Sequence, residues 1–486
     1  MIESLVAREL GHAPPPPIND PDLERQVRDA VAASERKVVA LDDDPTGVQT
    51  VHNTAVLARW NRDVLAAELR RSAPLFFVLT NARSLPEEGA TALNREIAAR
   101  LLAASRDSGA PFAIVSRSDS TLRGHFPAET DALAGVLGGV DGVLICPAFF
   151  EGGRVTAGDV HYVREGERLT PAAETEFARD ATFGYRARSL PEWVEEKSRG
   201  QISASGVASI SLEDIRRGGP DRVADRLRRV RGGHPVIVNA LDYPDLWTVV
   251  LGLLRVEDEG MRFLYRSGAS FVRARAGIDA RPLLTREELL GSRASRSARG
   301  VVIVGSHVRR TTEQLRQLVS LAEVEGVEVA VPELLEGAGA FQRETARVSR
   351  LADETLASGR TPVIFTSRRV VRPAAMDELT VARTVSDALV AIVREMEGRP
   401  DFVVGKGGIT SSDIGTRGLG AVRAIVLGQT RPGVPVWRLG AESRFPGLPY
   451  VVFPGNVGDR DTLADIVREL IGSRLQEEGE GGRESC

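Results

Sequence analysis

The chain has 486 residues, of which 42% are hydrophobic and 27% are charged, and its formal net charge is −4 at pH 7. The length predicts two or three domains, and the near-balance of charges gives no electrostatic case for nucleic-acid binding. Two cysteines, Cys146 and Cys486, are too few and too far apart for a disulfide framework or a cysteine-rich metal site. No apolar run approaches the roughly 18 to 20 residues of a membrane span, and residues 1–4 do not begin a secretory signal. We therefore expect a cytoplasmic protein.

The first half of the chain reads as an α/β domain behind an N-terminal arm. A proline run within residues 13–17 cannot sustain a helix, so residues 1–35 are predicted to form the arm. Short apolar runs then alternate with helical stretches such as residues 87–104, a pattern typical of a parallel sheet covered on both faces. We place this domain at residues 36–275, with strands at 37–41, 75–80, 112–116, 142–146 and 236–239.

A second α/β series follows a break in the pattern. Residues 276–299 mix Arg, Ser and Gly and are predicted to be a linker, and the Glu- and Gly-rich residues 474–486 a disordered tail. The predicted fold is thus two α/β domains, each with a mainly parallel sheet flanked by helices, and a ligand cleft between them. The second domain is placed at residues 300–473, with strands at 301–304, 327–331, 362–366, 402–405, 424–427, 434–439 and 450–453.

Polar side chains follow the first predicted strand directly. Asp42, Asp43 and Asp44 are consecutive, which costs electrostatic energy unless a cation or hydrogen-bond donors neutralise them. A solvated turn with a helix cap explains such a run equally well when it is taken alone. Ligands of open α/β sheets bind at the carboxyl ends of strands, and this position favours a ligand or Mg²⁺ site.

The next two strands end in similar chemistry. Arg83 follows one of them, and Arg117, Ser118, Asp119 and Ser120 lie at the end of the other. Arginine forks bind carboxylates bidentately, while Asp and Ser exchange hydrogen bonds with hydroxyls, so the set suits a small polyhydroxy acid. The alternative for each single residue is a structural ion pair or a helix cap.

Three histidines lie near these polar loops. His52, His125 and His161 could join Asp43 or Asp44 in a metal site, but no two of them have the spacing of a zinc site. Structural or substrate hydrogen bonding is the favoured interpretation.

Glycine-rich loops follow three strands of the second domain. Gly305-Ser306 precedes a helix expected from about Thr311, Lys406 stands before Gly407-Gly408, and Gly455 follows the last strand. Such glycines let a phosphate lie against main-chain N–H groups, and the charge of Lys406 makes its loop the sharpest phosphate candidate. The P-loop and dinucleotide fingerprints and the protein-kinase motifs are absent from the sequence.

Taken together in chain order, these motifs resemble the four-carbon acid sugar kinase family (the DUF1537 type), and the resemblance covers almost the whole chain. The residues that carry it are Asp43-Asp44-Pro45-Thr46-Gly47, Ser118-Asp119-Ser120-Thr121-Leu122-Arg123-Gly124, Gly305-Ser306, Gly407-Gly408-Ile409-Thr410 and Gly455-Asn456.

The resemblance implies an ATP-dependent kinase of threonate, erythronate or 3-oxo-tetronates, with an N-terminal substrate domain and a C-terminal nucleotide domain. It further implies that Asp43, Arg83 and the stretch 117–120 bind the acid sugar. Ser306, Gly407, Gly408, Ile409, Thr410 and Gly455 would bind ATP. Members of the family often have Lys in place of Arg117 and an acidic residue in place of Ile409, and Asp42 and Pro45 make the first loop unusual for the family. These departures leave open whether the substrate is a branched or a 3-oxo acid sugar.

The expected chemistry is in-line transfer of a phosphoryl group from ATP to a terminal hydroxyl, with Mg²⁺ reducing phosphate repulsion. Asp43 and Asp119 are both candidates for the base that accepts the hydroxyl proton. Two alternatives stay open: an NAD(P)-dependent hydroxy-acid dehydrogenase, which NAD(P)H formation without ATP would reveal, and a noncatalytic acid-sugar sensor, which would bind sugar acid without ATP. A homodimer is the default assembly.

Overall fold

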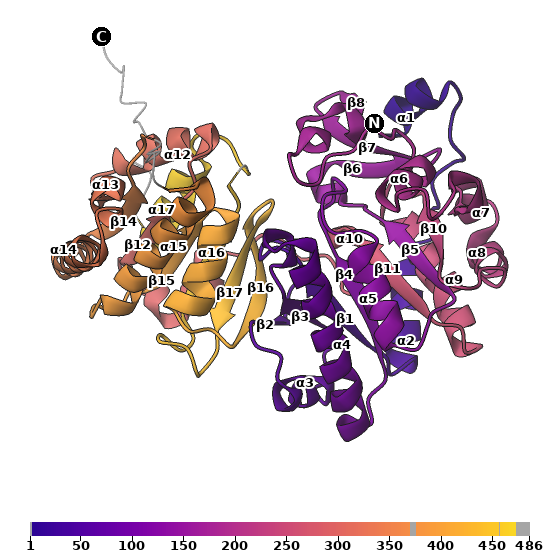
Figure 1. Cartoon of the computed structure of the whole chain (residues 1–486), viewed down its shortest axis with the longest axis horizontal. Coiled ribbons are helices and arrows are strands. Elements are labelled where there is room, and N and C mark those ends of the chain that lie inside the picture. The colour runs from indigo at the N-terminus through magenta and orange to yellow at the C-terminus, as the bar shows by residue number, and fades with distance from the viewer. Residues whose placement is uncertain (1, 370–375, 456, 473–486) are drawn as a thin grey trace, which may run out of the picture. The chain divides into compact units, whose positions relative to one another are not determined.

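The computed structural model of the chain describes residues 2–369, 376–455 and 457–472 (Figure 1). Its internal contacts divide the chain into two compact units. Unit 1 comprises Met1–Pro282 with Val422–Gly428, and unit 2 comprises Leu283–Ala421 with Gln429–Cys486. Among the helices described, none is long and apolar enough to cross a membrane. The predicted tail, residues 474–486, lies outside the described residues.

Unit 1 is built on a parallel sheet in the strand order β2-β3-β1-β4-β11-β5-β10-β9. Every residue of β1 is buried, and because alternate side chains of a strand point to opposite faces, both faces of the sheet are covered. The strands are β1 (Lys37–Asp42), β2 (Thr54–Leu57), β3 (Leu75–Leu79), β4 (Phe112–Arg117), β5 (Gly142–Cys146), β9 (Ala208–Ile210), β10 (His234–Val238) and β11 (Phe263–Ser267).

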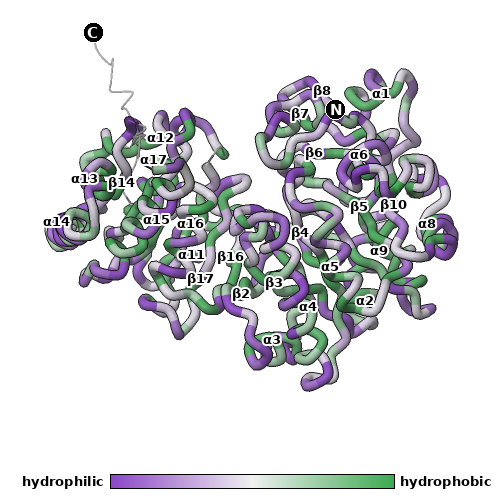
Figure 2. The backbone as a smooth tube through the Cα atoms, viewed as in Figure 1, coloured by the Kyte–Doolittle hydropathy of each residue, from purple (hydrophilic) through white to green (hydrophobic). Residues whose placement is uncertain are grey.

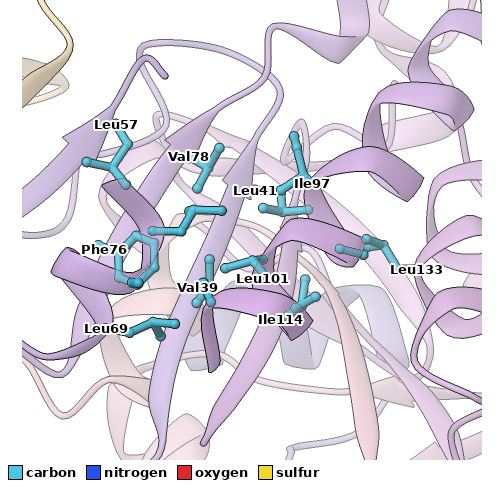
Figure 3. Packing of buried hydrophobic residues seen from close by; sticks show 14 of the residues in the cluster. Val39, Leu41, Leu57, Leu69, Phe76, Val78, Ile97, Leu101, Ile114 and Leu133 are labelled. Atoms are coloured by element: carbon cyan, nitrogen blue, oxygen red, sulfur yellow. The ribbon is translucent and has the colours of Figure 1, made fainter. Parts of the chain in front are cut away.

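Hydrophobic side chains of helices fill one face of this sheet (Figure 3). Val39 and Leu41 of β1 pack with Ile97 and Leu101 of α4 and with Leu133 of α5, all of them buried. Burial of each such side chain contributes about 1.5 to 3 kcal/mol to folding. The helices of unit 1 are α1 (Ile2–Leu10), α2 (Leu23–Ala33), α3 (Arg62–Leu69), α4 (Glu87–Ser108), α5 (Ala128–Val136), α6 (Leu190–Lys197), α7 (Leu212–Arg216), α8 (Gly219–Leu227), α9 (Tyr243–Asp258) and α10 (Ala269–Arg275).

A small antiparallel sheet, which the sequence analysis did not predict, stands beside the main one. It consists of β6 (Arg154–Ala157), β7 (Val160–Glu165) and β8 (Arg168–Pro171). Leu5 and Val6 of α1 pack against Val155 and Tyr162 of this sheet, so the segment predicted as an arm contributes buried side chains to unit 1.

Within unit 2 the strands follow the order β13-β14-β12-β15-β18-β17 and are parallel except for β17. In Figure 2 hydrophobic stretches, in green, alternate with hydrophilic ones, in purple, along the chain of unit 2. The strands are β12 (Gly300–Val304), β13 (Val324–Val329), β14 (Thr361–Thr366), β15 (Phe402–Lys406), β17 (Val434–Leu439) and β18 (Pro449–Phe453). The helices are α11 (Arg286–Leu290), α12 (Arg309–Val319), α13 (Val331–Leu334), α14 (Ala338–Ala357), α15 (Glu378–Glu395), α16 (Gly408–Asp413) and α17 (Thr462–Ile471).

One segment of the second half of the chain belongs to unit 1. Within β16 (Arg423–Arg431), residues 423–426 pair antiparallel with β2, and Arg423 Nε lies 2.8 Å from Glu68 Oε2. The predicted fold class, α/β with mainly parallel sheets flanked by helices, is confirmed. The domain limits 36–275 and 300–473 stay predictions, and they did not include this exchanged segment.

Candidate active site

The polar residues of unit 1 meet at the carboxyl ends of β3, β1, β4 and β11. The register pairs Asp42 with Arg117, and Arg117 with Ser267. Beyond the strands, the Asp43 N–H donates to the Arg117 carbonyl at 3.2 Å, and the Ser118 N–H donates to the Ser267 carbonyl at 3.0 Å. These backbone bonds hold the polar loops side by side, as the strand-end argument expects.

Arg83 and Arg117 are neutralised by the aspartates of the site. Arg83 donates to Asp44, lies 3.2 Å from Asp119 and approaches Asp43 Oδ2 to 3.8 Å. Arg117 Nη1 lies 3.4 Å from Asp42 Oδ1 and 3.8 Å from Asp43 Oδ1. The consecutive carboxylates therefore have their counter-charges within the protein, and these two guanidinium groups are already paired.

Asp119 is saturated with hydrogen bonds. Arg123 donates to it through Nε at 2.9 Å and Nη2 at 3.2 Å, and Thr121 donates from both its backbone N–H and its hydroxyl. Burial alone would raise the pKa of Asp119, but Arg83 and Arg123 hold the pKa far below its usual range. Asp119 is thus a firmly ionised anchor for the loop, and a poor proton acceptor.

Asp43 is different, since neither of its carboxylate oxygens has a hydrogen-bond partner among the described residues. The residue is 5% exposed, and burial raises its pKa despite the opposing effect of Arg83 and Arg117. Burial also raises the pKa of Asp42 to about 8, whereas Arg83 and Thr46 overcome burial and lower the pKa of Asp44. Of the consecutive aspartates, Asp43 has both oxygens without a hydrogen-bond partner among the described residues, whereas Asp42 has one such oxygen, Oδ2.

The predicted serines lie in the same loops and are buried. Ser118 is buried with its hydroxyl 3.4 Å from that of Ser116, and the carbonyl of Ser120 is 2.7 Å from His161 Nε2. His161 Nδ1 in turn is 2.9 Å from the Thr156 hydroxyl, and His125 Nε2 is 2.9 Å from the Leu85 carbonyl. His52 Nε2 lies 3.2 Å from the Asp279 carbonyl, so the three histidines make structural hydrogen bonds. Across the described ranges, no group of three or more His, Cys, Asp or Glu side chains is gathered as a metal site.

Two buried charged residues were missed by the sequence analysis. Arg266, on β11 opposite Ser116 of β4, is 1% exposed, and its Nη1 has no hydrogen-bond partner among the described residues. Glu129 of α5 is 5% exposed, and burial together with the charge of Asp43 raises its pKa to about 7. The sequence analysis did not predict β11, because Arg266 interrupts the apolar run by which such a strand is recognised.

In unit 2, the three predicted loops also meet. The register pairs Val304 with Lys406 and Lys406 with Phe453, so the loops after β12, β15 and β18 begin at the same edge of the sheet. The Thr311 hydroxyl, in the first turn of α12, donates to the Gly455 carbonyl at 2.9 Å and lies 3.3 Å from the Ser306 hydroxyl. Asn456, also named in the sequence analysis, lies outside the described residues.

Lys406 does not have the role that its sequence position suggested. Its side chain is fully buried, and its ammonium group donates to the carbonyls of Pro454 at 2.6 Å and Gly455 at 2.9 Å. Burial, with a smaller effect of Arg310, lowers its pKa to about 7. Lys406 ties the loop after β18 to β15, and we assign it no phosphate contact.

The glycines of these loops keep backbone close to Ser306. Gly407 has φ +117°, and a Cβ there would lie 3.0 Å from Ser306 Cβ, while a Cβ on Gly455 would lie 3.4 Å from Ser306 Oγ. A Cβ on Gly305 would meet the Thr410 hydroxyl at 2.3 Å. Gly408 opens α16, where the side chain of Ile409 is 68% exposed. Backbone amides bordered by glycines in this way suit a phosphate.

Comparison with known families matches both halves of the chain. Residues 38–275 match the family model described as a sugar-binding N-terminal domain, and residues 301–463 match the model described as a nucleotide-binding C-terminal domain.

Two relatives and two solved structures illustrate the likeness. The chain is 30% identical over 214 residues to a D-threonate kinase of Bordetella bronchiseptica, covering 42% of this chain and 46% of the relative. It is 25% identical over 292 residues to a D-erythronate kinase of Heliobacterium modesticaldum, covering 57% and 59%. The matches thus span roughly half of each relative. Two crystal structures share the fold. One, from Salmonella typhimurium LT2, has a TM-score of 0.64 and 18% identity, and the match covers 90% of this chain and 99% of that one. The other, from Haemophilus influenzae, has a TM-score of 0.61 and 17% identity, and the match covers 89% of this chain and 100% of that one.

Proposed function

Because this chain belongs to the four-carbon acid sugar kinase family, we propose that it transfers a phosphoryl group from ATP to the terminal hydroxyl of a four-carbon acid sugar, or of a 3-oxo or branched relative. The observation that carries the proposal is the cluster of paired charges at the strand ends of unit 1. Among the described carboxylates of that cluster, Asp43 has two buried oxygens that accept no hydrogen bond. Such oxygens fit the hydroxyls of a polyhydroxy acid.

The acid sugar is proposed to lie against Asp43, Arg83, Arg117, Ser118, Asp119 and Ser120. The ion pairs among these residues fix the loops in place before the substrate arrives, so that little ordering remains to be done on binding. Arg83, with one side toward Asp119 and another toward Asp44, is the residue that links the loops after β1 and β4.

ATP is proposed to lie on the loops of unit 2, against Ser306, Gly407, Gly408, Ile409, Thr410 and Gly455. Glycines that approach Ser306 support the proposal, because they leave backbone amides accessible to phosphate oxygens. Mg²⁺ would supply charge neutralisation at the phosphates. Protein ligands of this ion would number one or two, as is usual for Mg²⁺ carried by a nucleotide.

Asp43 is the better of the two candidate bases. Its raised pKa and its unpartnered oxygens suit a group that accepts a hydroxyl proton, whereas Asp119 is held ionised by Arg83 and Arg123. Phosphoryl transfer then depends on orienting the hydroxyl in line with the phosphate and on balancing charge, more than on covalent chemistry.

The direct test is ADP release by the purified chain with ATP and Mg²⁺ against a panel of four-carbon, branched and 3-oxo acid sugars. Turnover of one acid, with none in the absence of ATP, would support the kinase. Formation of NAD(P)H from the same acids without ATP would instead identify a dehydrogenase, and acid binding without ATP binding would identify a sensor.

The assignment of the base is tested by Asp43→Asn compared with Asp119→Asn. We expect Asp43→Asn to lower kcat about 10²- to 10⁴-fold with little change in the KM for the acid sugar. Asp119→Asn is expected to act mainly on that KM, because it loosens the loop. Full turnover by Asp43→Asn would rule out its role as the base. Assembly as a homodimer stays a prediction, to be checked by sedimentation.

A further inference from the structure

Four arginines are buried among the described residues of the chain, and three of them have a carboxylate partner. Arg117 pairs with Asp42, Arg275 pairs with Glu257, and Arg273 lies within reach of two glutamates. The fourth, Arg266, has no carboxylate of the described residues in ion-pair contact. A charge buried without a partner is energetically costly, and proteins rarely keep one without a use for it.

The surroundings of Arg266 do not replace that partner. Its guanidinium lies over the ring of Trp193, 4.9 Å from the centroid, and Nη2 donates to the Arg123 carbonyl at 3.1 Å. Nη1 has no hydrogen-bond partner in the described structure. Burial lowers the pKa of Arg266, while Asp43, Asp119 and Glu129 favour its charged form from a distance.

Arg266 and Asp43 both come close to Gly124. A Cβ built on Gly124, which has φ +123°, would lie 3.6 Å from Asp43 Oδ2, 3.9 Å from Arg266 Nη2 and 3.9 Å from Ser118 Cβ. Gly124 thus lies between a donor, the Arg266 guanidinium, and an acceptor, Asp43 Oδ2. The guanidinium nitrogen nearest to Gly124 is Nη2, which already donates to the Arg123 carbonyl, and the nitrogen without a partner among the described residues is Nη1. The donor is positively charged and the acceptor is a carboxylate.

We infer that Arg266 binds the carboxylate of the acid substrate, so that Asp43 faces a hydroxyl of the same molecule. The inference rests on the proposed function and deepens it, since it assigns the recognition of the acid group to a residue outside the family motifs of this chain. Arg83 and Arg117 are less suited to that role because aspartates already neutralise them.

Arg154 provides a matched control for this assignment. It also has no carboxylate of the described chain in ion-pair contact, and its guanidinium lies 5.9 Å from the ring centroids of Phe149 and Phe177. It differs in being only half-buried and in donating to the Gly152 carbonyl. If a free guanidinium near the site were enough for acid recognition, Arg154 would serve as well as Arg266.

The test compares acids with uncharged counterparts of the same length. Calorimetric titration of the wild type, Arg266→Met and Arg154→Met would use D-threonate and D-erythronate against threitol and erythritol. We expect Arg266→Met to weaken binding of the acid about 30-fold, with alditol binding unchanged, because a charged hydrogen-bonding group is lost. Arg266→Lys should recover part of the loss, and Arg154→Met should bind as the wild type does.

A second measurement needs no ligand. In thermal unfolding of the free protein, we expect the Tm of Arg266→Met to equal or exceed that of the wild type, because the substitution removes an unpaired charge. Arg275→Met should instead lower the Tm, because Glu257 then loses one of its arginine partners. An acid preference that survives Arg266→Met overturns the inference and leaves the kinase proposal standing. A Tm drop as large as that of Arg275→Met likewise overturns it, by assigning Arg266 to the fold. A wild type that binds no acid at all overturns both.

Discussion

The hydrogen bonds of His161 predict a measurable pH dependence of stability. Burial lowers the pKa of His161 from 6.5 to about 4, because the charged ring loses its solvation, and the hydrogen bond that Nε2 donates to the Ser120 carbonyl opposes this shift only in part. Nδ1 accepts from the Thr156 hydroxyl and has to be unprotonated to do so. The unfolded chain takes up this proton near pH 6.5 and the folded chain only near pH 4. The free energy of unfolding therefore falls as the pH is lowered through that window. The difference in pKa corresponds to about 3 kcal/mol.

Replacing His161 by Gln keeps a donor for the Ser120 carbonyl and removes the titration. Urea unfolding at pH 7 and at steps down to pH 4 should show that the wild type loses about 3 kcal/mol more than His161→Gln over this range. His12→Gln, at an exposed position, should follow the wild type. Parallel profiles for the wild type and His161→Gln would refute the reasoning, because they would mean that His161 takes up its proton equally in both states.

Three further substitutions test the loops. Arg83→Ala should raise the KM for the acid sugar at least about 10-fold, and more than the KM for ATP, because Asp44 and Asp119 lose their shared ion-pair partner. Steady-state kinetics with each substrate varied in turn would show the larger increase in the KM for ATP if Arg83 contacted the nucleotide. Gly407→Ala should lower stability by about 1 to 2 kcal/mol, since φ is +117°, and should raise the KM for ATP; unchanged ATP kinetics would place the nucleotide elsewhere. Lys406→Met should remove the donor of the Pro454 carbonyl and one of the two donors of the Gly455 carbonyl, and should lower the Tm by several degrees, measured by calorimetry. An unchanged Tm would contradict the structural role of Lys406.

Strands with unbroken apolar runs could be predicted from the sequence, and those interrupted by polar residues could not. The run at residues 37–41 became β1, and the run at residues 402–405 became β15, each within one residue at its ends. β11 was missed because Arg266 falls within it, and β2 because four residues are too few to establish a period. The strands of the small sheet were missed because charged residues and glycines separate their apolar positions.

For the site, position along a strand was more informative than residue type. Asp43, Arg83, Arg117 and Asp119 could be grouped because carboxyl ends of neighbouring parallel strands meet. The pairing of each charge depends on side-chain directions that no sequence pattern encodes. Lys406 shows this most clearly, since its charge is bound by carbonyls of a loop 48 residues further along the chain.

The strand that residues 423–426 add beside β2 has a consequence for the order of folding during synthesis. Until the ribosome has passed residue 428, the edge of β2 has no neighbour on that side and Glu68 lacks its Arg423 partner. The nascent unit 1 therefore keeps an open sheet edge until most of unit 2 has been synthesised. A fragment that stops at residue 282 would keep that edge open permanently and is expected to self-associate through it.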